Sequence, residues 1–83
     1  MRVTVRLFAR LRDIVGSGEI TRAADEGATL GDVWRGLVRD YPDLDPYTPA
    51  ISGARNADYV RLDAPLVDGD EVAFLPPVSG GST

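Results

Sequence analysis

Residues 29–42, TLGDVWRGLVRDYP, predict one amphipathic helix around which the rest of the fold can be arranged. Thr29 stands where a helix N-cap is expected, the acidic Asp32 follows three places later, and Pro42 ends the run. Two glycines lower the helix preference by up to about 1 kcal/mol each, so packing against a sheet has to stabilise the helix. The side chains that would make this contact recur at helical spacing, at Leu30, Val33, Trp34, Leu37, Val38 and Tyr41.

Two strands are predicted before this helix. RVTVRLFAR, residues 2–10, alternates as a half-buried strand does, with Val3, Val5, Leu7 and Ala9 on the buried face. Phe8 then falls on the opposite face. LRDIVGSG, residues 11–18, predicts a short helical turn that ends at its glycines, and EITRAA, residues 19–24, predicts the second strand of a wide hairpin.

The segment after the helix predicts a loop followed by short strands. DLDPYTPAISG, residues 43–53, has the prolines and turn formers of an irregular crossing loop. ARNADYVRLD, residues 54–63, predicts a strand or a strand pair, with Val60 and Leu62 facing one way and Tyr59 the other. VDGD, residues 67–70, predicts a tight turn into the last strand, where Val72 and Phe74 point inward and Ala73 and Leu75 outward. Asp68, Asp70 and Glu71 are therefore interpreted as turn residues rather than as a metal site.

This order of elements predicts an α+β fold of the β-grasp, or ubiquitin-like, type: a mixed sheet, one main helix and a flexible C-terminal tail. The first and last strands are expected to lie side by side and parallel, joined by a right-handed crossover through the helix. A chain of 83 residues has room for one such domain. We expect the domain to span residues 1–76 and the tail to span residues 77–83.

The pattern also predicts an apolar patch on the face of the sheet that the helix leaves open. Phe8 and Leu75 should lie near each other there, with Tyr59 beside them. Exposed aromatic and aliphatic side chains of this kind mark a partner site, or they are single surface hydrophobes of the ordinary sort. The pattern alone leaves both interpretations open.

Composition narrows the classes of function. The chain has no His and no Cys, so it lacks the usual zinc ligands, the thiol nucleophile and the commonest general base. A net charge of −4 argues against nucleic acid as a partner. No apolar run approaches the ~20 residues of a membrane helix, and no signal peptide is recognisable, so we expect no membrane association and a cytoplasmic location. We also expect no metal and no bound cofactor.

The ending FLPPVSGGST, residues 74–83, predicts a slender tail. Pro76 and Pro77 hold the chain extended, and Val78, Ser79, Gly80 and Gly81 have little bulk, so this segment can enter a narrow slot. A carboxylate on Gly81 could react there with a nucleotide phosphate and then with a sulfur nucleophile. The chain would be a substrate of another protein's active site rather than a catalyst. A Gly-Gly pair alone is more typical of idle termini than of a functional tail.

Three segments together resemble the family of ubiquitin-like sulfur carriers that includes the small subunit of molybdopterin synthase: VRLFARLRDIVG at 5–16, ARNADYVRLDAPLV at 54–67 and DGDEVAFLPPVSGG at 68–81. The resemblance implies that Gly81 is adenylylated by an ATP-dependent activating enzyme and converted to a thiocarboxylate. It implies that the tail then enters the large synthase subunit, a sulfur-donating role without catalysis by this chain. Phe8, Tyr59 and Leu75 match the hydrophobic docking face of that family.

The sequence departs from the family pattern after Gly81, where Ser82 and Thr83 follow. With these residues attached the Gly81 carbonyl is part of a peptide bond, so we expect a protease to remove them; a cloning remnant or a shield for the tail are the alternatives. Other functions stay open. The chain could carry sulfur for cysteine, thiamine or another thio-metabolite, serve as a ubiquitin-like protein modifier, or be a binding domain with an idle tail.

Overall fold

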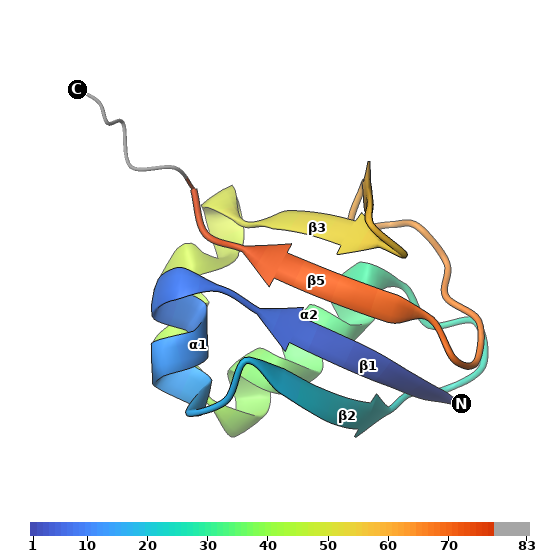
Figure 1. The fold of residues 1–83 in the computed structure, drawn as a ribbon, viewed down its shortest axis with the longest axis horizontal. Helices are drawn as coiled ribbons and strands as arrows, with labels where there is room; N and C mark the ends of the chain where they lie inside the picture. Colours follow the sequence, from blue (N-terminus) through green and yellow to red (C-terminus); the bar gives the residue numbers. More distant parts are fainter. Residues whose placement is uncertain (78–83) are drawn as a thin grey trace.

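The computed structural model describes residues 1–77 and shows a five-stranded mixed sheet with a helix packed across one face (Figure 1). The strands lie in the order β2-β1-β5-β3-β4. This arrangement confirms the predicted α+β β-grasp fold. The strands are β1 (Arg2–Leu7), β2 (Glu19–Ala23), β3 (Ser52–Arg55), β4 (Asp58–Val60) and β5 (Glu71–Leu75); the helices are α1 (Ala9–Val15), α2 (Leu30–Asp40) and the 3-10 helix η1 (Pro42–Ala50).

The first and last strands form the centre of the sheet and run parallel, as predicted. Val5 is opposite Val72 and Leu7 is opposite Phe74. The predicted hairpin also exists, since β1 pairs with β2 in antiparallel register. β3 pairs with β5 and β4, both antiparallel. The chain leaves β5 at the end of the sheet near α1, which is where any following residues must begin (Figure 1).

The core lies between α2 and the face of the sheet formed by alternate residues of β1 and β5. Trp34 and Phe74 are at its centre, with ring centroids 5.1 Å apart and planes tilted by 55°. The indole N–H of Trp34 donates to the Thr48 hydroxyl at 2.9 Å, so this buried donor is satisfied. The other buried members include Val3, Val5, Leu7, Leu11, Leu30, Val33, Leu37, Leu44, Leu66 and Val72.

The predicted helix begins with a capping box. The Thr29 hydroxyl accepts from the Asp32 N–H at 3.2 Å, and the Asp32 carboxylate accepts from the Thr29 N–H at 2.9 Å. The Thr29 N–H and the Arg35 guanidinium both stabilise the charged carboxylate, and they hold the pKa of Asp32 below its usual value. The first turn of α2 is thus fixed by the residues that the sequence indicated.

Two predictions of local structure were wrong. Ala9 was expected on the buried face of β1, but it starts α1, is exposed and has a φ of 53°. The chain turns there because Leu11 of α1, and not the small Ala9, fills the end of the core. Residues 43–53 were expected to form an irregular loop, but most of them belong to η1, which the buried Leu44 anchors to the core.

The predicted VDGD turn is present and is tied to the neighbouring hairpin. Gly69 has a φ of 88°, and the Asp70 N–H donates to the Val67 carbonyl at 3.1 Å. The buried Asp70 carboxylate accepts from the Val67 N–H at 2.9 Å and from the Asn56 side-chain amide at 3.0 Å. These bonds favour the charged form and lower the pKa of Asp70. The structure thus confirms the turn role of Asp68 and Asp70, whereas Glu71 is the first residue of β5.

No helix in the described residues 1–77 has the length and apolar character needed to cross a bilayer.

Candidate functional site: the open face of the sheet

The face of the sheet opposite α2, here called the open face, has small residues at its centre. The strand registers bring one side chain from each strand into a row across it. Ala73 and Ala54 occupy the middle of this row, and both are short enough to leave the backbone of β5 and β3 approachable by a partner. The full row runs Glu19, Arg6, Ala73, Ala54, Tyr59.

Phe8 and Leu75 lie on adjacent strands at one end of the open face. The parallel ladder pairs Leu7 with Phe74, and each of the two residues follows directly on its strand. Phe8 is extended, with φ −126° and ψ 154°, so its side chain alternates to the face opposite Leu7. Phe8 remains 39% exposed and Leu75 is half-buried. The structure therefore brings these two predicted docking residues together.

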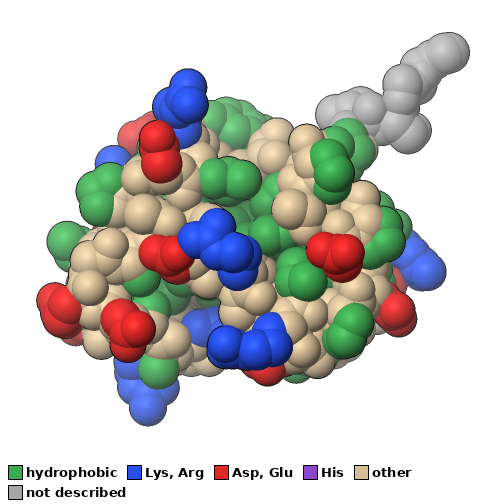
Figure 2. All heavy atoms as spheres, turned by 180° about the vertical axis from the view of Figure 1, so that it is seen from behind, with side chains coloured by type: hydrophobic (Ala, Val, Ile, Leu, Met, Phe, Trp, Pro, Cys, Tyr) green, Lys and Arg blue, Asp and Glu red, His purple; other side chains and the backbone are tan. Residues whose placement is uncertain are grey.

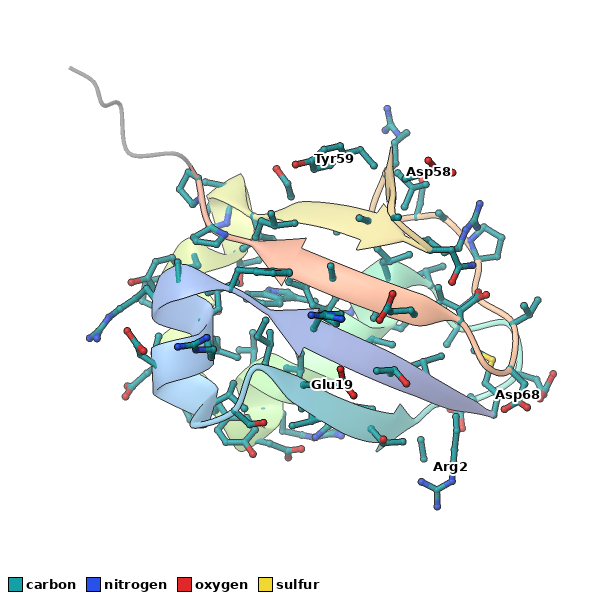
Figure 3. All side chains as sticks on the ribbon, viewed as in Figure 1. Arg2, Glu19, Asp58, Tyr59 and Asp68 are labelled. Carbon is teal, nitrogen blue, oxygen red and sulfur yellow. The ribbon has the colours of Figure 1, made fainter. Side chains whose placement is uncertain are left out.

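Tyr59 shares the open face as predicted, but the prediction that it lies beside Phe8 and Leu75 was wrong. It lies on the edge strand β4, beyond β3, and its side chain is 74% exposed (Figure 3). Its register partner Ala54 keeps only 8% of its surface exposed. A partner that covers Phe8 and Tyr59 together must therefore also lie over the small residues between them.

Arg6 forms the polar boundary of the patch, and sequence reasoning did not single it out. Its Nη1 is 3.5 Å from Glu71 Oε2 and 3.8 Å from Glu19 Oε1. These side chains are about half exposed, and such pairs contribute at most about 1 kcal/mol. The alternation of β1 places Arg6 on the same face as Phe8, which was the available signal. The pairing needed the strand order, which alternation does not give.

The last strand leads from this corner into the expected tail. Pro76 is half-buried and Pro77 is exposed, and neither can donate to a ladder, which ends β5 at Leu75. Val78, Ser79, Gly80 and Gly81, together with Ser82 and Thr83, lie outside the described residues. Among residues 1–77, the remaining large exposed hydrophobe is Val67, which belongs to the turn before β5 and so lies beyond the far end of that strand.

A β-grasp sheet with an exposed apolar corner on its open face, whose last strand runs into a proline pair and a Gly-Gly sequence, defines a ubiquitin-like carrier protein. The chain belongs to the ThiS family, whose model matches residues 5–81. The match includes both Gly80 and Gly81.

Some of the proteins to which the chain is similar are named as sulfur carrier subunits, and others as small modifier proteins. It is 37% identical to the molybdopterin synthase sulfur carrier subunit of Chlamydomonas reinhardtii, over 98% of this chain and 100% of that protein. The crystal structure of SAMP1, small archaeal modifier protein 1, from Haloferax volcanii matches with a TM-score of 0.82 and 32% identity, covering 98% and 100% of the two chains. A chain in the complex of subunits 1 and 2 of molybdopterin-converting factor from Helicobacter pylori matches with a TM-score of 0.67 and 28% identity, covering 98% and 100%.

Proposed function

We propose that this chain is the sulfur carrier subunit of a molybdopterin synthase and holds its sulfur as a thiocarboxylate on Gly81. Its family and its similarity to named sulfur carrier subunits support this function. The observation on which the proposal rests is the position of Phe8 and Leu75, beside each other where β5 passes into Pro76. A protein that covers this corner also receives the residues that follow.

The chemistry takes place in the active sites of other proteins, as the missing His and Cys suggest. A Gly81 carboxylate oxygen attacks the α-phosphate of ATP bound by an activating enzyme, and pyrophosphate leaves. A sulfide nucleophile then attacks the carbonyl carbon of the acyl adenylate and displaces AMP, which leaves a thiocarboxylate. The chain itself holds no cofactor in this scheme, and we place the reaction in the cytoplasm.

The sulfur is delivered in a complex with a large synthase subunit. The Helicobacter chain similar to this one is seen with its partner subunit, which supports an assembly of the same kind here. We infer that Phe8, Tyr59 and Leu75 contact the large subunit while residues 76–81 enter its active site. Gly80 and Gly81 would fit a channel that any larger side chain blocks. The pterin precursor in that site would accept the sulfur.

Ser82 and Thr83 must be removed first, because the Gly81 carbonyl is otherwise an amide and offers no carboxylate. We propose a protease that cuts after Gly81. The test compares two chains, residues 1–81 and residues 1–83, each incubated with ATP, sulfide and the activating enzyme. Mass spectrometry should show replacement of one oxygen by sulfur only in the chain that ends at Gly81. Equal conversion of the intact longer chain would refute the requirement for cleavage.

A second experiment tests the acceptor. The thiocarboxylate form is mixed with the large subunit and the pterin precursor. Two products are then measured: the dithiolene, and the carrier that has returned to a carboxylate. A complex without sulfur transfer would reject the proposed function. A chain with Gly80 and Gly81 replaced by valine is the control, and it should bind through the open face but transfer no sulfur.

The similarity to SAMP1 favours protein modification as the second candidate function. In that case the activated Gly81 carbonyl would be attacked by a lysine amine of a target protein. Because this chain contains nine basic residues and all are Arg, it cannot form lysine-linked chains with itself. Detection of Gly81 in isopeptide bonds to cellular proteins would support this alternative.

A further inference from the structure

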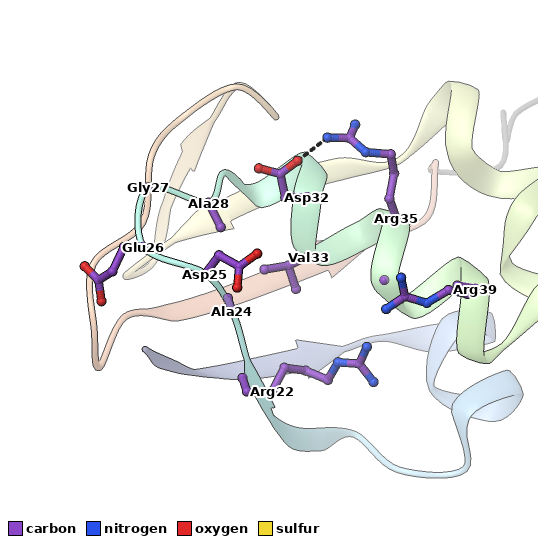
Figure 4. Close-up of a pocket in the computed structure, with 12 residues that line it drawn as sticks. Arg22, Ala24, Asp25, Glu26, Gly27, Ala28, Asp32, Val33, Arg35 and Arg39 are labelled. Atoms are coloured by element: carbon purple, nitrogen blue, oxygen red, sulfur yellow. Dashed lines mark hydrogen bonds and ion pairs between the residues drawn. The ribbon is translucent and has the colours of Figure 1, made fainter.

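The edge of the sheet at β2 borders a cavity that the proposed sulfur chemistry does not use. The cavity has a volume of about 590 Å³ and lies between β2, the loop after it and α2, on the helix side of the sheet (Figure 4). Its walls carry three guanidinium groups and three carboxylates, and two of these, Arg35 and Asp32, form an ion pair with each other. The charged residues are Arg22 of β2, Asp25 and Glu26 of the loop, and Asp32, Arg35 and Arg39 of α2, alongside Ala23, Val33 and Gly36.

Two residues of β2 present unpaired backbone groups at this edge. Antiparallel strands alternate between residues that exchange backbone hydrogen bonds and residues that do not. Met1 exchanges both bonds with Ala24, and Leu7 donates to Gly18 at 3.0 Å. The register between them makes Ile20 and Arg22 the other bonded positions, so the N–H and C=O groups of Glu19, Thr21 and Ala23 point away from β1.

One of these three positions is already satisfied. The Ser17 hydroxyl donates to the Glu19 carbonyl at 2.9 Å and accepts from the Glu19 N–H at 3.3 Å, which blocks strand addition there. Within residues 1–77, no hydrogen bond is found for the outward groups of Thr21 and Ala23. The free part of the edge is therefore the part that borders the cavity.

Two guanidinium groups converge on the cavity from β2 and α2 (Figure 4). A Cβ placed on Gly36 would lie 3.2 Å from Arg22 Nη2 and 3.9 Å from Arg39 Nη2, so a side chain at this position would occupy their meeting point. Asp40 is shared between them, at 2.7 Å from Arg22 Nη1 and 4.0 Å from Arg39 Nε. One carboxylate thus serves two cations, and Arg39 remains 80% exposed.

We propose that this edge is a second docking site, which binds an extended acidic peptide segment of a partner protein by adding it as a strand to β2. The segment would exchange backbone hydrogen bonds with Thr21 and Ala23. Its residue opposite Arg22 would face the helix side, as Arg22 does, and an Asp or Glu there would pair with Arg22 and Arg39. Basic side chains near the middle of an otherwise mixed surface are seen on this side of the molecule (Figure 2).

The site is separate from the corner formed by Phe8 and Leu75, since β1 lies between β2 and β5 and the cavity opens on the opposite side of the sheet. A carrier with both sites could remain bound to one protein through the β2 edge while its open face and C-terminal segment pass to another. The site does not depend on the proposed function.

The test uses the full 83-residue chain and a short capped peptide of alternating threonine and valine with one central glutamate. In ¹⁵N NMR titrations we expect saturable shifts at the amides of Thr21, Ala23 and Gly36, with slowed hydrogen exchange at Thr21 and Ala23. Phe8, Tyr59 and Leu75 should not respond. A peptide with glutamine in place of glutamate should bind about threefold to tenfold more weakly, and added salt should remove most of this difference.

Two variants test the two parts of the proposed contact, the backbone hydrogen bonds and the ion pairs. Ala23→Pro removes an N–H that does not bond to β1, and it should weaken peptide binding by about tenfold or more. Arg39→Gln should weaken it by about threefold. Arg61→Gln is the matched control, because Arg61 is 89% exposed and has an equally loose carboxylate neighbour, Asp63 at 3.6 Å. It should leave binding unchanged.

Three results would overturn the proposal. The first is the absence of shifts at Thr21 and Ala23 up to the solubility limit of the peptide. The second is an equal loss of binding in the Arg39→Gln and Arg61→Gln variants. The third is a shift of the Thr21 and Ala23 amides with protein concentration before any peptide is added, which would assign the edge to a second copy of this chain.

Discussion

The two faces of β1 and β5 are made from alternate residues of the same two strands, yet they are under different constraints. Val5, Val72 and Phe74 face α2 and are fully buried. Arg6, Ala73 and Leu75 face the open side and keep part of their surface exposed. The helix side is fixed by packing, so changes there should alter folding. The open side has little packing to lose, so changes there should alter binding.

The largest expected effect is on the helix side. Phe74→Ala removes the ring that packs against Trp34 at a centroid distance of 5.1 Å, and leaves a cavity in the centre of the core. We expect the free energy of unfolding to fall by about 3–5 kcal/mol, a large part of the total for a domain of this size. Urea denaturation followed by Trp34 fluorescence and circular dichroism measures it. A loss below about 1 kcal/mol would show that the helix side is not the main source of stability.

A smaller effect is expected at the hydrogen bond between Trp34 and η1. Thr48→Val keeps the shape of the side chain but removes the acceptor of the buried indole N–H, now bonded at 2.9 Å. The expected loss is about 1–2 kcal/mol in the same denaturation assay. Thr21→Val, at an exposed position of β2, is the control and should change stability little. An unchanged Thr48→Val protein would mean that water replaces the hydroxyl.

The third effect depends on pH and lies at the turn that aligns β5. The folded-state pKa of Asp70 is lowered from 3.8 by its bonds to the Val67 N–H and the Asn56 amide. Its stabilising contribution is therefore present above the unfolded-state pKa and is lost as the pH falls through the lower folded-state value. In Asp70→Asn this part of the pH dependence should vanish, which denaturation midpoints between pH 2 and 7 would reveal. An unchanged slope would assign the acid sensitivity to other carboxylates.

The helix side was the part of the fold that sequence reasoning could predict. Apolar periodicity located α2, the alternation in β1 and β5 located the buried face, and two prolines marked the end of β5. Each signal is local and follows from burial. The 3-10 helix η1 was not predicted, because it is anchored by Leu44 and by the hydrogen bond from Trp34 to Thr48. Both depend on contacts with α2 that local composition does not show. The exposed position of Ala9 at the start of α1 was not predicted, because Leu11 determines where the chain turns.

The open side could be predicted only in part. Phe8 stood out because it is a large apolar residue on the polar face of its strand. Leu75 and Tyr59 were assigned to the open face from the alternation of side chains in their own strands. The distance of Tyr59 from the other two depends on β3 lying between β4 and β5, and the ion pairs of Arg6 depend on β1 lying between β2 and β5. The free edge at Thr21 and Ala23 required the hydrogen-bond register. Strand order and register are set by the whole chain, which is why a single segment did not reveal them.

The smallest effect on stability is expected for a substitution on the open face, which should nevertheless strongly weaken binding. This contrast tests the comparison of the two faces most directly. Leu75→Asp places a charge on the open face without entering the core, so unfolding should change by less than about 1 kcal/mol. Binding to the large synthase subunit should weaken by at least about tenfold, because the carboxylate would be buried without a partner. Val67→Asp is the matched control, since Val67 is 66% exposed at the far end of β5. If both substitutions weaken binding equally, the effect is one of net charge, and the corner formed by Phe8 and Leu75 is not where the partner docks.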